Sequence, residues 1–321
     1  MDPTDPSTFN HQYFNANGLR LHYVDENQSA SKALLLIHGW PDLWLGWREQ
    51  IPFLAKLGYR VIVPTIRGYG ESEGPAEAVK YTDKYLTADL DALLDHLQIP
   101  TVAVLGHDWG GLVAWRFAQF YPHRVEAVAS FCTPYLVPNT EPITLQQFVE
   151  KLPNFTYQLH LVSPKAEEEI NAHTEAFFKR FFRPVGDLKE PMIDPNTKTM
   201  VEGRAELPKS DVVSQRVLDY YVSQYRQRGA GTSLNLYKRF EYQFEDNKGL
   251  NPIIEKPALM VTSEGDRALP PAMTHGMEKY VPKVEFRNIE GAGHWVLWEK
   301  PAECNKYLEE WLPKVYPATS A

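Results

Sequence analysis

The residues best suited to chemistry lie in a glycine-rich hexapeptide. Gly106-His107-Asp108-Trp109-Gly110-Gly111 follows a short apolar run and precedes an amphipathic stretch at residues 112–120. Small residues around Asp108 fit a tight strand-to-helix turn, which lifts one side chain clear at the edge of a sheet. A carboxylate held there can displace a leaving group at saturated carbon and form an ester that water then cleaves. Asp108 is therefore the candidate nucleophile, and the alternative is a structural N-cap of the following helix.

An acid and a base follow Asp108 in the chain order that is typical of such a turn. Asp266 comes after the apolar run 258–262, on a loop expected at the same sheet edge as Asp108. His294 follows Gly291-Ala292-Gly293, whose glycines allow the backbone to carry an imidazole inward. We expect His294 to activate water and Asp266 to orient His294, with Glu264 as a rival to Asp266 on the same loop.

A second motif, His38-Gly39-Trp40-Pro41-Asp42, follows the apolar run at residues 33–37. A loop in that place supplies one backbone N–H to an oxyanion hole, and the residue after the nucleophile supplies the other. The backbone N–H groups of Trp40 and Trp109 are the expected donors. Side chains expected around the substrate pocket come from both motifs, from a phenylalanine-rich stretch and from the neighbour of His294: His38, Pro41, Trp109, Phe178 and Trp295.

Strand-like and helix-like stretches must alternate along the chain to position these residues. Residues 12–14 and 19–24 flank the turn signal Asn-Ala-Asn-Gly and predict a β-hairpin. Apolar runs that predict strands occupy residues 33–37, 61–63, 102–105 and 125–131, and the strand pattern resumes at residues 258–262 and 284–289. Helical periodicity falls at residues 85–97, 112–120, 272–280 and 301–312. Strands that alternate with helices predict a mostly parallel sheet flanked by helices, which is an α/β fold.

The middle of the chain interrupts this alternation. From residue 134 to residue 250 the pattern loses its strands and predicts helices broken by Pro and Gly, including residues 165–170 and 212–226. We expect a core made of residues 1–133 and 251–321, with residues 134–250 inserted as a helical lid.

Composition excludes several classes of function. The formal net charge is -8 and the 33 Lys and Arg residues are scattered, so nucleic acid is an unlikely partner. Cys132 and Cys304 predict neither a disulfide framework nor a metal site, and the glycine spacing after residue 67 fails the dinucleotide fingerprint, so we expect no metal and no cofactor. The polar start lacks the features of a signal peptide and no run is long enough to span a membrane, which predicts a cytoplasmic protein. The sequence leaves open whether it is a monomer or a homodimer.

Four segments resemble the α/β-hydrolase epoxide hydrolases of the soluble, cytosolic type: His38-Gly39-Trp40-Pro41, the hexapeptide around Asp108, Tyr157-Gln158-Leu159 and Gly293-His294-Trp295. The resemblance covers residues 13–312 and implies the α/β-hydrolase fold with its lid. It also implies that an epoxide and water are converted to a vicinal diol through an ester on Asp108. Two lid tyrosines hold the epoxide oxygen in that family, and the resemblance maps them onto Tyr157 and Tyr237, although Leu236 and Lys238 depart from the family's usual neighbours.

Two other functions fit parts of this pattern. A haloalkane dehalogenase shares the nucleophilic Asp and can hold the halide with the indole of Trp109, but Trp40 stands where an amide side chain would be expected as the second halide donor. A hydrolase fold can also serve as a non-catalytic receptor for small molecules, against which the apparently complete triad argues. Whether the role is detoxification or biosynthesis stays open.

Overall fold

The computed structural model describes residues 1–187 and 190–318, and its centre is a mostly parallel β-sheet. In this part of the chain the sheet has eight strands in the order β1-β2-β4-β3-β5-β6-β7-β8. β1 and β2 form the predicted hairpin, and β2 pairs antiparallel with β4. The remaining neighbours in the sheet, from β4 through β3 to β8, pair in parallel. The strands are His11–Ala16, Leu19–Glu26, Ala33–Ile37, Arg60–Pro64, Val102–His107, Val125–Phe131, Ala258–Ser263 and Val284–Ile289.

The strand pattern follows from local chemistry. Asn17 and Gly18 both have positive φ, 53° and 77°, which matches the two-residue turns that join hairpins. All residues of β3, β5 and β7 are buried, as expected for parallel strands that are covered on both faces. The predicted strands are thereby confirmed.

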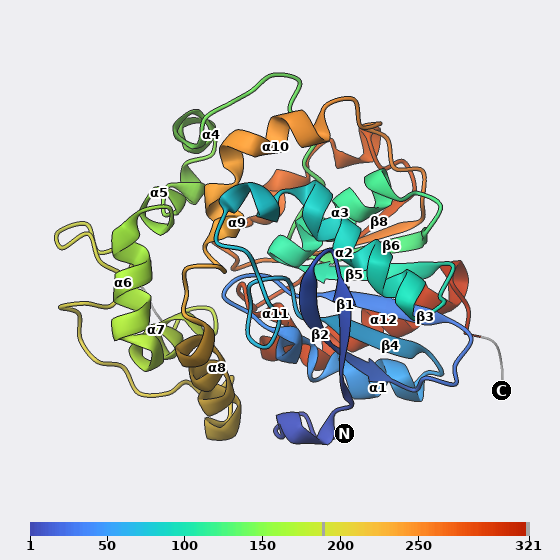
Figure 1. Cartoon of the computed structure of the whole chain (residues 1–321), viewed down its shortest axis with the longest axis horizontal. Helices are drawn as coiled ribbons and strands as arrows, with labels where there is room; N and C mark the ends of the chain where they lie inside the picture. Colours follow the sequence, from blue (N-terminus) through green and yellow to red (C-terminus); the bar gives the residue numbers. More distant parts are fainter. Residues whose placement is uncertain (188–189, 319–321) are drawn as a thin grey trace.

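Helices cover both faces of the sheet. α2 (Asp83–His96) packs on α3 (Trp109–Phe120), and α1 (Gln50–Lys56) packs on α12 (Pro301–Val315). The two pairs lie on opposite sides of the strands, with the short α11 (Val296–Glu299) beside α12 (Figure 1). This is the layering of a parallel sheet with crossover helices, as predicted.

Between β6 and β7 the described residues form helices and no strand. The helices are α4 (Leu145–Lys151), α5 (Gln158–Leu161), α6 (Pro164–Ala172), α7 (Thr174–Phe181), α8 (Gln215–Arg228), α9 (Asn235–Lys238) and α10 (Phe240–Asn247). α4 to α8 lie to the left of the sheet in Figure 1, and α9 and α10 lie above it. We refer to residues 134–250 as the helical segment, of which residues 188–189 lie outside the described residues.

Local signals explain where α8 starts and stops. The helix predicted from residue 212 begins at Gln215, because the Ser214 side chain accepts a hydrogen bond from the backbone N–H of Val217. It ends before Gly229, whose φ is 79°.

The helix predicted at residues 272–280 is wrong. The segment forms two short 3-10 turns, η5 (Pro271–Thr274) and η6 (Met277–Lys279). Gly276 lies between them with φ 79°, a left-handed conformation that ends a helix. His275, predicted inside a helix, caps η5 instead.

None of the helices in the described residues is both long and apolar enough to cross a bilayer.

Candidate active site

Asp108 sits on a strained turn between β5 and α3. Its backbone has φ 53° and ψ -126°, a conformation that a non-glycine residue rarely adopts. Although Asp108 occupies the N-cap position of α3, its side chain makes no capping hydrogen bond. The N-cap alternative therefore does not explain the residue, and its carboxylate is available for other contacts.

Two glycines make this turn possible because neighbouring backbone fills the space of a side chain. A Cβ at Gly106 would lie 2.2 Å from the carbonyl oxygen of Gly110, and a Cβ at Gly110 would lie 2.1 Å from that of Ile37. The start of α3 thus packs directly on the ends of β3 and β5. Thr133, which the sequence did not single out, donates a 2.6 Å hydrogen bond from Oγ1 to the carbonyl oxygen of Asp108.

The structure brings Asp108, His294 and Asp266 together. His294 Nδ1 lies 2.8 Å from Asp266 Oδ2, and His294 Nε2 lies 3.6 Å from Asp108 Oδ2. The other oxygen of Asp266 accepts hydrogen bonds from the backbone N–H groups of Ala268 and Leu269, both at 2.9 Å. Glu264, the rival on the same loop, is exposed and its carboxylate accepts from the N–H of Gly291 instead.

Electrostatics set distinct charge states for the three side chains. Burial alone would favour a neutral imidazole, but the carboxylates of Asp266 and Asp108 outweigh burial and raise the pKa of His294 from 6.5 to about 9. Burial opposes the charge on Asp266 too, yet His294 and the backbone N–H of Leu269 lower its pKa to about 2. Burial raises the pKa of Asp108, partly offset by His294. The imidazolium at rest therefore lies between two carboxylates.

The loop after β3 reaches the carboxylate of Asp108. The backbone N–H of Trp40 donates to Asp108 Oδ1 at 2.8 Å. Burial dominates the pKa of Asp108 and raises it, while the N–H groups of Trp40 and Trp109 act in the opposite direction by hydrogen bonding. The indole Nε1 of Trp40 donates to Ser233 Oγ in the helical segment at 3.2 Å, which holds the loop from the other side. The N–H groups of Trp40 and Trp109, the two predicted oxyanion donors, thus lie beside the carboxylate of Asp108.

Tyr157 and Tyr237 face each other from the helical segment. Their ring centroids are 6.5 Å apart, and Tyr237 also packs edge-on against Trp40 and Trp109 at 5.2 Å and 5.1 Å. Burial and the nearby charge of Asp108 raise the pKa of Tyr157 above its ordinary value of 10, and burial with Tyr157 and Asp108 does the same for Tyr237. Both hydroxyls therefore stay protonated at neutral pH, as hydrogen-bond donors must.

Two cavities meet at Asp108 and Tyr157, which line both. The outer cavity has a volume of about 690 Å³ and is also lined by Tyr237, His294 and Trp295. The inner cavity has a volume of about 150 Å³ and lies between α3 and the helices α9 and α10. Its wall is mostly apolar but includes charged side chains; wall residues include Trp109, Leu112, Phe148, Leu236, Asp83 and Arg239. A molecule at Asp108 can therefore extend in two directions.

The structure corrects two of the predicted pocket residues. Pro41 and Trp295 line the outer cavity and Trp109 the inner one, but His38 and Phe178 lie on neither wall. His38 is fully buried, and its ring joins the loop after β3 to the loop after β4. Its Nδ1 donates to the carbonyl of Gly39 at 2.9 Å, and its Nε2 accepts from the N–H of Ile66 at 3.0 Å.

Phe178 is also fully buried, but within the helical segment itself. Its ring packs against Phe182, Tyr221 and Tyr225. Phe181, one turn further along the same helix, lines the outer cavity in its place. Helical spacing in the sequence indicates which phenylalanines share a face but does not indicate which face meets the cavity.

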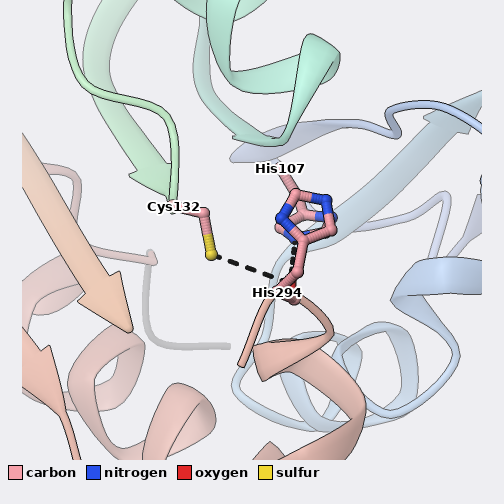
Figure 2. A group of neighbouring side chains, drawn as sticks. All are labelled: His107, Cys132 and His294. Carbon is pink, nitrogen blue, oxygen red and sulfur yellow. Dashed lines mark hydrogen bonds between the residues drawn. The ribbon is translucent and has the colours of Figure 1, made fainter. Parts of the chain in front are cut away.

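Two side-chain groups in the described residues could in principle hold a metal ion. One is His107, Cys132 and His294, and the other is His11, His22 and Glu71. Figure 2 shows the first group, in which His107 and Cys132 both point to the main chain of His294. In the second group, His11 Nδ1 and His22 Nε2 lie 2.8 Å apart in a hydrogen bond. In both groups, atoms that could bind a metal already form hydrogen bonds within the protein.

Comparison with known proteins identifies the class of protein. Residues 32–301 match the alpha/beta hydrolase fold family. The sheet order, the turn at Asp108 and the crossover helices agree with this match. The chain belongs to the α/β-hydrolase fold family, as its resemblance predicted.

Individual relatives indicate which group within the α/β-hydrolase fold family the chain belongs to. "Bifunctional epoxide hydrolase 2" of Rattus norvegicus is 37% identical over 316 residues, which are 97% of this chain and 56% of the rat protein. The chain thus spans about half the length of the first curated relatives that it matches. "Epoxide hydrolase srdG" of Neurospora crassa is 34% identical, and the match covers 97% of this chain and 97% of that protein. The crystal structure of Epoxide Hydrolase A from Mycobacterium thermoresistibile superimposes with a TM-score of 0.83 at 31% identity, covering 95% of this chain and 98% of that one. Within the α/β-hydrolases, the chain belongs to the epoxide hydrolases.

Proposed function

We propose that this protein hydrolyses epoxides to vicinal diols through an ester on Asp108. The observation that carries the proposal is the shared cavity wall, on which Asp108 and His294 face two protonated tyrosines, Tyr157 and Tyr237. A carboxylate, a base and a pair of hydroxyls that can donate a proton are the groups that ring opening followed by ester hydrolysis requires. The names of the relatives support the same activity.

In the first half-reaction, Asp108 Oδ2 forms a bond to a ring carbon while the bond from that carbon to the epoxide oxygen breaks. Oδ2 suits this role because Oδ1 already accepts the N–H of Trp40. The epoxide oxygen takes a proton from Tyr157 or Tyr237 as it leaves. The product is a hydroxyalkyl ester whose carbonyl oxygen is Oδ1.

In the second half-reaction, His294 Nε2 removes a proton from water, and the water oxygen attacks the ester carbonyl carbon. The developing negative charge lies on Oδ1, which the N–H groups of Trp40 and Trp109 stabilise. Collapse of the intermediate releases the diol and restores the carboxylate. The leaving oxygen of the diol takes the proton that His294 removed from water, and the Asp108 carboxyl group returns the second water proton to His294. One epoxide and one water therefore give one diol per turnover.

Esterification itself prepares His294 for this step. At rest, the charge of Asp108 helps to hold His294 in the imidazolium form. An ester on Asp108 is neutral, so the pKa of His294 falls. The imidazolium then passes its proton to the tyrosinate that ring opening left, and the neutral imidazole can accept a proton from water. The first half-reaction thereby switches on the base of the second.

The helical segment, residues 134–250, is proposed to act as a cap over a core formed by residues 1–133 and 251–321. It contributes Tyr157 and Tyr237 and much of the wall of both cavities. We also propose that the protein works in the cytoplasm, where a reducing environment suits the free buried thiols Cys132 and Cys304.

The test is to incubate wild type and Asp108→Ala with styrene oxide and, separately, with a 1-chloroalkane, and to quantify diol and chloride. We expect diol from wild type and none from the variant. Chloride without diol would instead assign a haloalkane dehalogenase, and saturable binding without either product would assign a receptor.

A further inference from the structure

The main-chain carbonyl of His294 is held by two side chains that the mechanism does not use. His107 Nε2 lies 2.8 Å from this oxygen, and the thiol of Cys132 donates to it at 3.7 Å. Figure 2 shows both side chains converging on the backbone of His294, one from the end of β5 and the other from just beyond β6. The loop that carries His294 is thus fastened to the ends of two adjacent strands, β5 and β6.

The bond from His107 fixes its tautomer. A carbonyl oxygen can only accept, so His107 must carry its proton on Nε2, and Nδ1 is left as an acceptor. His107 Nδ1 is buried and has no hydrogen-bond partner among the described residues. Burial, together with the charge of His294, lowers the pKa of His107 to about 3, so the ring stays neutral beside an imidazolium. An apolar side chain would avoid the unpaired Nδ1, which indicates that the Nε2–H donor has a use.

The backbone conformation of Cys132 is also energetically unfavourable. Its φ is 66°, in the left-handed region that favours glycine, and the residue is 1% exposed. The backbone N–H of Cys132 donates to the carbonyl of Val261 at 2.8 Å, which holds the residue at the edge between β6 and β7. A strained backbone and an unpaired nitrogen therefore occur in the two residues that contact the same carbonyl.

We propose that His107 and Cys132 are positioning residues that hold the His294 loop so that its imidazole spans Asp266 and the ester on Asp108. The inference rests on the proposed function, because it assigns these residues to the half-reaction in which His294 takes a proton from water. Ester formation uses Asp108 and the tyrosines, none of which hydrogen-bonds to the side chain of His107 or Cys132. Loss of the clamp should therefore slow ester hydrolysis and spare ester formation.

The kinetic test uses two matched pairs of variants. His107→Leu removes the donor, whereas His107→Gln keeps an amide N–H in reach of the same carbonyl. Cys132→Ala and Cys132→Ser form the second pair and decide the question if His107→Leu does not fold. Rapid quench and intact mass measure ester formation and ester hydrolysis separately during a single turnover of styrene oxide.

We expect His107→Leu to slow ester hydrolysis by roughly tenfold to a hundredfold, as a displaced catalytic group does. Ester formation should stay close to the wild-type rate, and His107→Gln should recover most of the lost rate. Equal slowing of both steps would overturn the proposal, because it would indicate general damage to the fold. A Gln variant as slow as the Leu variant would overturn it as well.

A second readout needs no substrate. The Nδ1 proton of His294, shared with Asp266, can be followed by NMR in each variant. We expect its resonance to be retained in His107→Gln and shifted or lost in His107→Leu; an unchanged resonance in His107→Leu would contradict positioning. If wild type forms no ester from any epoxide, the proposed function fails, and this comparison still decides whether the clamp orients His294.

Discussion

Among single residues, Asp108 and His294 are coupled by charge at a distance of 3.6 Å. Removing the negative charge of Asp108 should disfavour the imidazolium, so the pKa of His294 is expected to fall from about 9 toward its ordinary value in Asp108→Asn. The asparagine side chain imitates the uncharged ester in shape and charge. A ¹⁵N NMR titration of His294 in both proteins measures the difference. An equal or higher pKa in the variant would contradict the proposal that neutralising Asp108 lowers the pKa of His294.

The same shift links pH to stability. The pKa of His294 is raised in the folded protein above its ordinary 6.5, so the stabilisation is complete below about pH 6.5 and is lost as pH rises through about 9. The melting temperature of the wild type should therefore fall across this interval. Asp108→Asn, in which the shift is smaller, should show a smaller fall in the same buffers.

The hydroxyl groups of Tyr157 and Tyr237 are expected to matter only while the epoxide ring opens. Replacing either with Phe should slow ester formation by roughly tenfold to a hundredfold, because the remaining tyrosine still supplies a proton. Hydrolysis of the ester should be unchanged. Single-turnover measurements separate the steps, and Tyr135→Phe is the control, since the Tyr135 hydroxyl donates to the carbonyl of Pro252 outside both cavities. Slower ester hydrolysis in Tyr157→Phe would assign that residue a different role.

At the scale of elements, glycines allow β3, β5 and α3 to approach one another at the Asp108 turn. An added side chain would meet different atoms at each of these glycines. A Cβ at Gly39 would lie 2.3 Å from Oδ1 and 2.5 Å from Cβ of Asp108, so the whole Asp108 side chain would have to shift, whereas a Cβ at Gly110 would lie 2.1 Å from the carbonyl oxygen of Ile37. Gly39→Ala should therefore fold and lose about a hundredfold or more in ester formation, because the carboxylate is displaced.

Gly110→Ala should instead be destabilised by about 3 kcal/mol or more, because backbone atoms of β3 cannot give way. Thermal melts of the two variants, recorded beside activity, measure the contrast. A stable, active Gly110→Ala would show that α3 can dock differently from the arrangement described above. A destabilised Gly39→Ala would mean that the loop after β3, and not the carboxylate, takes the strain.

Across the whole molecule, a buried ionic network joins the core to the helical segment. Asp83, at the start of α2, accepts hydrogen bonds from Arg116 in α3 and from three side chains of the helical segment: Arg239 at 2.7 Å, Gln243 at 2.6 Å and Asn247 at 3.1 Å. The charges of Arg239 and Arg116 overcome burial and lower the pKa of Asp83, which stays ionised. Because the same residues line the inner cavity, the network fixes both the attachment of the segment and the shape of the site.

Breaking this network should loosen the helical segment before the sheet. Arg239→Met leaves Asp83 short of a charge partner and should cost about 3–5 kcal/mol. Hydrogen exchange is expected to quicken in α9 and α10 while β5 remains protected. Lys306→Met is the control, since its ion pair with Glu310 is exposed and its loss should change stability by less than about 0.5 kcal/mol. Uniform loss of protection across the sheet would show that the segment and the core open as one unit.

The sequence by itself determined the parts of this protein that depend on neighbours in the chain. The glycines around Asp108 require a tight turn there, and the apolar runs on either side require a buried strand and a helix. Parallel strands present their carboxyl ends at one edge, so the order of Asp108, Asp266 and His294 was enough to predict that they meet. These inferences hold because turn geometry and side-chain periodicity are local properties.

Tertiary structure alone decided which of several suitable side chains make contact. Asp266 and not Glu264 reaches His294, Phe181 and not Phe178 faces the cavity, and His38 turns into the protein. The clamp of His107 and Cys132 on His294 was equally hidden, because it joins residues more than a hundred positions apart. Local spacing says which side chains share a face, but the direction of that face depends on how distant strands and helices pack together.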